Sequence, residues 1–172
     1  QTMLRGVGVA RHGINTNTFH PLVRPVPSLI DAAHQGSLQT GAFYNWEQLR
    51  DLSDPGSLNV SHFCREVDSL EGDHCVAEIA MEQMQRLDLA LAFVYLGHLD
   101  HAGHHAGWMS AEYLAAVENA DRCIGRLVEG LEWLGWLEST VVLVTSDHGG
   151  HEKSHGTEMD EDMLVPWVLW GK

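Results

Sequence analysis

Basic residues are scarce in this sequence of 172 residues. It holds 10 Lys plus Arg against 24 Asp plus Glu, which gives a formal net charge of −14 with His neutral. Proteins that bind nucleic acid through its phosphates carry a basic surface, so the composition excludes nucleic-acid backbone binding as the main function. An acidic chain can still receive an anionic substrate if bound cations reverse the local field.

Long hydrophobic runs and cysteine motifs are also missing. The longest apolar run, LALAFVYLG, is far shorter than the roughly 20 residues that span a bilayer, so we expect no membrane segment. The three cysteines show no CxxC spacing, which argues against a cysteine zinc site or a thioredoxin-like motif. Their odd number argues against a full disulfide framework.

The sequence does contain an alternation of strand-like and helix-like segments, which predicts a layered α/β fold. A strand, a long helix and a second strand in succession favour a parallel pair with a right-handed crossover, and continuous apolar strands are expected to be buried on both faces. The segment 51–72 is the most loop-like and is a candidate insertion. We expect helices at 28–36, 73–87 and 110–135, and strands at 38–44, 89–96, 140–146 and 165–171.

Histidines gather after two of the expected strands. Seven of the 12 histidines lie in the windows 98–105 and 148–155. Because the carboxyl ends of parallel strands meet at one edge of a sheet, we expect the two windows to lie close together in space. The alternative is a pair of solvent-exposed histidine loops that bind metal only incidentally.

Carboxylates accompany the histidines in both windows. The mixture of carboxylate and imidazole suits zinc, and less well manganese or iron, but not calcium. Three further histidines, His101, His105 and His151, are expected to lie around the site or in solvent. The candidate metal ligands are Asp100 and His104 in a D-x-x-x-H motif, and Asp147, His148 and His155 in SDHGGHEKSHG.

The motifs YLGHLDHAGHHAG, VVLVTSDHGGHEKSHG and VPWVLWG, in this order around a long helix, resemble the alkaline phosphatase superfamily. The nearest look-alikes are type I phosphodiesterases, nucleotide pyrophosphatases and phosphonoacetate hydrolases. The resemblance is strong over residues 90–172 and weaker over the opening TMLRGVGVARHGINTN. It implies a three-layer α/β/α sandwich with a largely parallel central sheet, and one catalytic domain over residues 1–172.

The resemblance also implies two divalent metal ions, with zinc favoured and manganese as the alternative. One would be held by Asp100, His104 and His155, and the other by Asp147 and His148. In this family an early Asp and a Ser or Thr nucleophile complete the second site. The family pattern places that nucleophile a few residues before Gln1, so we expect a truncated domain that is inactive as the isolated 172-residue chain.

The function implied is hydrolysis of a small-molecule phosphate ester or diester through a covalent phospho-enzyme. Alternatives within the superfamily are a metal-dependent phosphomutase, a phosphonoacetate hydrolase and a sulfatase, the last disfavoured because His104 and His148 are retained. A complete chain would instead be a non-catalytic metal-binding module. We expect His12 to be structural and Lys153 to be a solvated loop residue.

Overall fold

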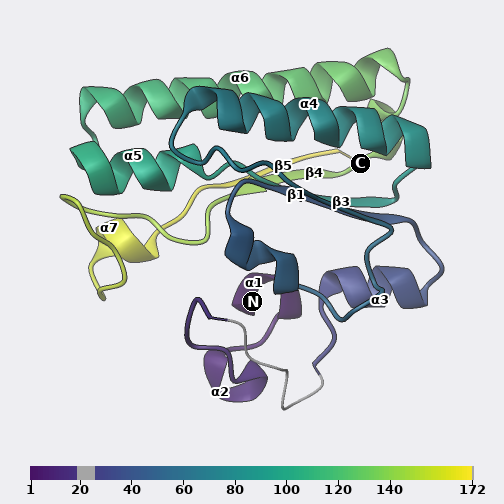
Figure 1. Ribbon diagram of the computed structural model, residues 1–172, viewed down its shortest axis with the longest axis horizontal. Helices are drawn as coiled ribbons and strands as arrows, with labels where there is room; N and C mark the ends of the chain where they lie inside the picture. Colours follow the sequence, from purple (N-terminus) through teal and green to yellow (C-terminus); the bar gives the residue numbers. More distant parts are fainter. Residues whose placement is uncertain (19–25, 172) are drawn as a thin grey trace.

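A three-stranded parallel sheet lies at the centre of the computed structural model, which describes residues 1–18 and 26–171. Strand β1 (Thr40–Tyr44) lies between β2 (Val60–Phe63) and β3 (Leu91–Tyr95). The register pairs Tyr44 with Phe63 on one side and with Tyr95 on the other. The carboxyl ends of the three strands therefore lie at one edge of the sheet (Figure 1).

Helices lie on both sides of the strands, as the predicted three-layer α/β/α arrangement requires (Figure 1). The helices expected at 28–36, 73–87 and 110–135 are confirmed, with shifts of a few residues at their ends. One layer holds α4 (Leu70–Leu87), α5 (His98–Ala106) and α6 (Ala111–Trp133). The elements on the other side include α1 (Thr2–Arg5), α2 (Val9–His12), α3 (Leu29–Gln35) and the 3-10 helix η1 (Glu47–Asp51).

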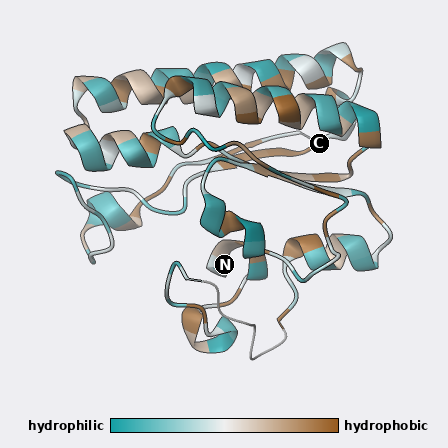
Figure 2. Cartoon of the chain, viewed as in Figure 1, coloured by the Kyte–Doolittle hydropathy of each residue, from teal (hydrophilic) through white to brown (hydrophobic). Residues whose placement is uncertain are grey.

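The core forms where α4 packs on the sheet. Val76, Ala80 and Met84 recur at every fourth residue and so share one face of α4, where they meet Phe43 of β1 and Leu131 of α6. Figure 2 shows hydrophobic residues concentrated along the strands, while the helices carry hydrophilic residues on their outer surfaces. Full burial of a side chain of this size contributes about 1.5–3 kcal/mol, so this layer holds α4 against the strands.

The last two strands differ from the prediction. Strands β4 (Val142–Thr145) and β5 (Trp167–Trp170) form a separate antiparallel ladder. No ladder joins β4 to β3 within the described residues, and β5 is exposed rather than buried. The predicted parallel β3–β4 pair is therefore wrong, because an apolar run identifies a strand but not its partner.

The segment 51–72, the candidate insertion, is mostly irregular over residues 52–59 and 64–69. It also contains β2, which pairs with β1, and the first residues of α4. The 3-10 helix η1 begins at Glu47, and the side chain of Asn45, just after β1, hydrogen-bonds to Gly97 N. The short helix α7 (Asp160–Met163) and the 3-10 turn η2 (Leu137–Ser139) complete the described elements.

None of the helices in the described part of the chain has the length and hydrophobicity needed to cross a membrane.

Candidate metal centre

The first histidine window is helical rather than a loop. It forms α5, which begins three residues after the end of β3. Helical spacing of four residues places Asp100 and His104 on the same face. His104 Nε2 consequently lies 3.6 Å from Asp100 Oδ1.

A buried polar network fixes the start of α5. The Asn45 side chain accepts a hydrogen bond from Gly97 N (2.8 Å) and donates one to Asp73 Oδ1 (2.9 Å), which also accepts from His98 N (3.3 Å). Burial raises the pKa of the Asp73 carboxyl above its usual range. The network ties the end of β1 to α4 and α5, and sequence reasoning missed it because Asn45 and Asp73 lie 28 positions apart in the sequence.

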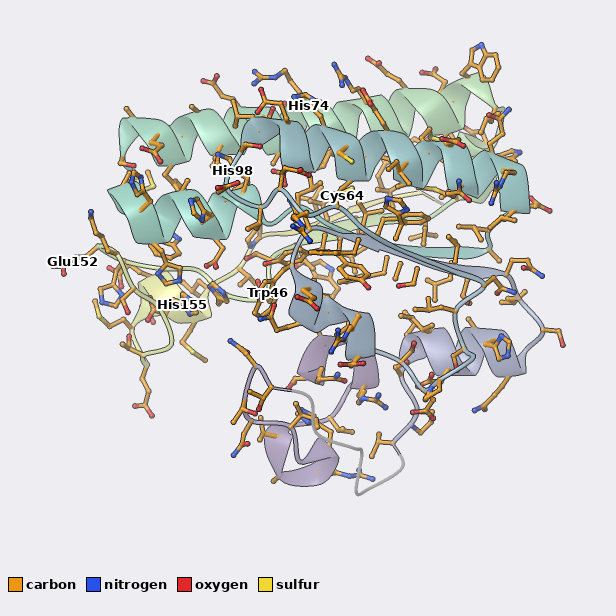
Figure 3. All side chains as sticks on the ribbon, in the orientation of Figure 1. Trp46, Cys64, His74, His98, Glu152 and His155 are labelled. Atoms are coloured by element: carbon orange, nitrogen blue, oxygen red, sulfur yellow. The ribbon has the colours of Figure 1, made fainter. Side chains whose placement is uncertain are left out.

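The second histidine window forms the loop after β4, and it returns two imidazoles to α5. His148 Nε2 and His155 Nε2 each lie 3.7 Å from Asp100 Oδ1, and His148 Nε2 lies 3.8 Å from Asp147 Oδ1. The rings of His148 and His155 stack with centroids 3.6 Å apart. Figure 3 shows His155 beneath α5. The structure thus brings together all five residues that were predicted as ligands.

The donor atoms fit a small divalent cation. Asp100 Oδ1 is buried and has no hydrogen-bond partner among the described residues, although three imidazole nitrogens lie 3.6–3.7 Å away. Donors held about 2.0–2.2 Å from a tetrahedral zinc ion are separated from one another by roughly 3.4 Å. The ligand atoms of Asp100, His104 and His155 all lie within 4.8 Å of one another. These distances exceed those of hydrogen bonds, and the three residues could hold a metal ion.

The imidazole tautomers also suit a metal. His104 Nδ1 lies 3.0 Å from the Lys153 carbonyl, and His148 Nδ1 lies 2.7 Å from the Gly149 carbonyl. A carbonyl oxygen only accepts, so we assign the proton of each ring to Nδ1, which leaves Nε2 free as a ligand. Burial lowers the pKa of His155, and the neighbouring His148 adds to this effect. The neutral form that binds metals is therefore favoured at His155.

Negative charge gathers beside this cluster. Burial raises the pKa of the Tyr95 phenol above its usual range, and the carboxylates of Asp147 and Asp100 raise it further. The two carboxylates thus act on the same phenol.

The remaining residues of the two windows have partners of their own. His105 Nδ1 lies 2.9 Å from Glu112 Oε1, and the His101 ring stacks on that of His105. Lys153 lies in the loop and is exposed, as expected, and its Nζ donates to the His105 carbonyl (2.6 Å). This bond joins the loop after β4 to α5.

His151 pairs with Asp162, a residue that sequence reasoning missed. His151 Nδ1 lies 2.7 Å from Asp162 Oδ1, and Oδ2 of the same carboxylate accepts from Thr157 N and from Thr157 Oγ1, both at 2.7 Å. The Asp162 carbonyl accepts from Gly149 N (2.8 Å). One buried aspartate therefore holds both ends of the loop that carries His155. Nothing within the acidic run EMDEDM distinguished it.

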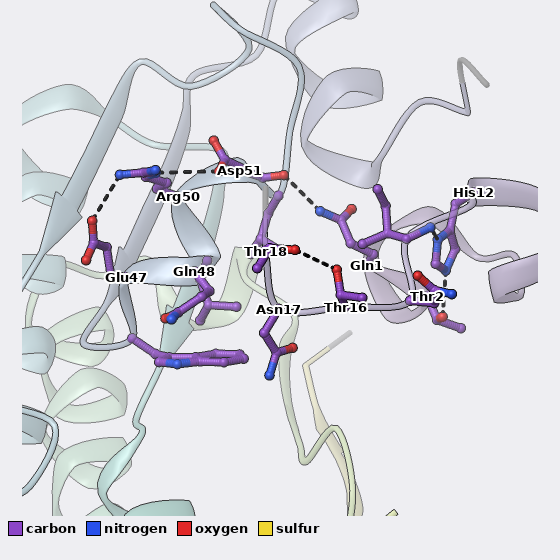
Figure 4. Close-up of a pocket in the computed structure, with 15 residues that line it drawn as sticks. Gln1, Thr2, His12, Thr16, Asn17, Thr18, Glu47, Gln48, Arg50 and Asp51 are labelled. Atoms are coloured by element: carbon purple, nitrogen blue, oxygen red, sulfur yellow. Dashed lines mark hydrogen bonds and ion pairs between the residues drawn. The ribbon is translucent and has the colours of Figure 1, made fainter. Parts of the chain in front are cut away.

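A cavity of about 420 Å³ lies in the amino-terminal part of the molecule (Figure 4). Gln1 Nε2 donates to the Asp51 carbonyl at its rim (2.8 Å). His12 is buried, as its expected structural role requires, and its Nε2 lies 2.9 Å from Thr2 Oγ1. Trp46 also lines the cavity. Its ring lies beside that of Tyr95, with the ring centroids 6.3 Å apart, so the cavity is next to the negatively charged cluster.

Comparison with known proteins gives one matching family, described as type I phosphodiesterase / nucleotide pyrophosphatase, over residues 14–165. Ectonucleotide pyrophosphatase/phosphodiesterase family member 1 of Mus musculus is 36% identical over 61 residues, which are 36% of this chain and 7% of that protein. Family member 7 of Rattus norvegicus is 25% identical, over 86% of this chain and 38% of that protein. The chain spans well under half the length of either relative.

Solved structures show the same fold. Murine ectonucleotide pyrophosphatase / phosphodiesterase 5, in an inactive form in complex with AMP, superposes with a TM-score of 0.68 at 20% identity, covering 86% of this chain and 44% of that one. The lipoteichoic acid synthase LtaP from Listeria monocytogenes superposes with a TM-score of 0.59 at 17% identity, covering 85% and 46%. The α/β fold of this chain, with its parallel sheet, is therefore similar to the folds of these two proteins.

Proposed function

Because this chain belongs to the type I phosphodiesterase / nucleotide pyrophosphatase family, we propose that it forms part of a two-metal hydrolase of phosphoric esters. The observation that carries the proposal is the Asp100 carboxylate. Its buried Oδ1 lies 3.6–3.7 Å from three imidazole nitrogens and lacks a hydrogen-bond partner among the described residues. A cation would satisfy this oxygen, and burial without a partner would otherwise be costly.

Each residue then has a role at the site. Asp100, His104 and His155 would hold one cation, and Asp147 and His148 would contribute to the other. The carboxylate and imidazole donors favour zinc, with manganese as the alternative. Bound cations would supply charge to stabilise the attacking and leaving oxygens of an in-line phosphoryl transfer. They would also let a chain of net charge −14 accept an anion.

The attacking group would be a Ser or Thr hydroxyl placed shortly before Gln1. Attack on phosphorus would form a bond from the hydroxyl oxygen to phosphorus and expel the alcohol or phosphate leaving group. Water would then hydrolyse the covalent phospho-enzyme.

The substrate would be a phosphodiester or a nucleotide pyrophosphate. The murine structure superposed above is a complex with AMP, which supports an ester with a nucleoside-sized organic group. The cavity of about 420 Å³ beside Gln1 and Trp46 offers room for such a group. Phosphonoacetate and phosphate monoesters are the competing substrates, and a substrate panel separates them.

The test uses Asp147→Ala in the full-length protein, with bis(p-nitrophenyl) phosphate and p-nitrophenyl phosphate as substrates. We expect turnover of the diester to exceed that of the monoester and to fall at least about 100-fold in the variant, since a charge-stabilising group is lost. Asp121→Ala, an exposed change on α6, is the matched control. Unchanged turnover in Asp147→Ala would remove this carboxylate from the proposed site.

A further inference from the structure

Trp108 lies between the two ligand-bearing elements. It follows Gly107, the residue that ends α5, and its backbone N–H donates to the Glu152 carbonyl of the ligand loop (2.7 Å). Its ring lies edge-on to the ring of His104, with the ring centroids 5.2 Å apart, and to the ring of His155, with the centroids 5.9 Å apart. A single indole therefore contacts one proposed ligand from each element.

Two glycines make room for this indole. A Cβ added at Gly103 of α5 would lie 2.7–2.8 Å from three atoms of the Trp108 ring. A Cβ added at Gly150 would lie 2.5 Å from ring atoms Cδ2 and Nε1. Real side chains do not approach this closely, so the ring packs directly against the backbone of both elements. The same indole ring is thus in close contact with the backbone of α5 and with that of the loop.

The loop is also bonded to α5 beside the ring. The Lys153 carbonyl lies 3.0 Å from His104 Nδ1, and Lys153 Nζ donates to the His105 carbonyl (2.6 Å). These bonds fix the direction in which the loop approaches, while the indole fixes its distance. A ligand set is sensitive to both, because donors must lie within a few tenths of an ångström of their productive positions.

We infer that Trp108 is a positioning residue that sets the distance between His104 and His155, and thereby the geometry of the metal centre. This inference rests on the proposed function, because it assumes that these histidines bind a metal. It also explains the glycine at position 150. The backbone conformation there does not require glycine, because φ is not positive, but a side chain would collide with the Trp108 ring. Trp108 touches neither substrate nor reacting atoms in this role.

The test measures Co²⁺ binding to this chain by visible absorption and by quenching of tryptophan fluorescence. We expect Trp108→Ala to weaken Co²⁺ binding about 10–100-fold, the usual effect of losing a group that orients metal ligands, and to alter the Co²⁺ absorption bands. Trp108→Phe, which keeps an aromatic plane, should restore most of the affinity. It should nevertheless lose most of the metal-dependent quenching, because the indole nearest the ligands is gone.

Gly150→Ala tests the packing separately. Its added Cβ should displace the ring and reproduce the altered Co²⁺ bands. Gly125→Ala, whose Cβ would meet nothing within 4 Å, should leave them unchanged. Circular dichroism without metal identifies any variant that fails to fold.

Two results would overturn the inference. Wild-type affinity and bands in Trp108→Ala would show that Trp108 does not position the ligands, while leaving the metal centre itself intact. An absence of Co²⁺ binding by the folded wild-type chain would overturn the metal centre and this inference together.

Discussion

Oδ1 of Asp100 lies 3.6–3.7 Å from the Nε2 atoms of three histidines, which come from two distant parts of the chain. The pairing of Asp100 with His104 could be predicted, because residues four apart share a helix face. The approach of His148 to Asp100 could not, since it depends on the path of the loop after β4. The family pattern assigned His148 to the other cation, and the structure places it 3.7 Å from Asp100 and 3.8 Å from Asp147.

Asp162 and His151 form an ion pair whose strength depends on pH. The hydrogen bond from His151 is the largest cause that lowers the pKa of Asp162, to about 2, and the same bond raises the pKa of His151. The Asp162 contribution to stability is present above its unfolded pKa of about 3.8 and is lost as pH falls through 2. The His151 contribution is present below about 6.5 and is lost as pH rises through the raised value.

We therefore expect Asp162→Asn to lower the free energy of unfolding most between about pH 4 and pH 6.5. The difference from wild type should shrink on both sides of this window. Urea unfolding from pH 3 to pH 8 measures it, with Asp160→Asn, an exposed neighbour, as the control. A difference that does not vary with pH would show that the pair does not titrate as a unit.

At the scale of elements, helices were easier to predict than strand partners. The helix at 110–135 was predicted from Ser110 as its cap and from apolar residues at helical spacing, and α6 spans Ala111–Trp133. Both signals are local in the sequence. By contrast, β2 carries only one β-branched residue, Val60, so nothing in its own sequence separated it from a loop. Its pairing with β1 is what makes it a strand.

The cap of α6 gives a prediction at this scale. Ser110 Oγ accepts a hydrogen bond from Tyr113 N (3.1 Å) and so satisfies one free N–H of the first turn. Ser110→Ala should lower the free energy of unfolding by about 1 kcal/mol, while Ser110→Asp should retain the cap. Urea unfolding at neutral pH measures both. Equal stability of Ser110→Ala and wild type would mean that the cap contributes nothing to the folded chain.

For the whole molecule, the layered α/β class and the family could be predicted because the motifs occur in order between the right elements. The division of the strands into a parallel sheet and an antiparallel β4–β5 ladder could not, since the sequence of a strand does not identify the strand it pairs with. Trp108 also escaped prediction, because its role depends on two glycines 47 positions apart that meet only in the fold.

The central claim is that Asp100, His104 and His155 hold a divalent cation. Zinc affinity of this chain, measured by competition with a chromogenic chelator, tests it most directly, using wild type, Asp100→Asn and the exposed control Asp121→Asn. We expect tight binding by wild type and the control, and a loss of at least about 100-fold in Asp100→Asn, since a charged ligand is removed. Equal zinc affinity in all three proteins would contradict the claim.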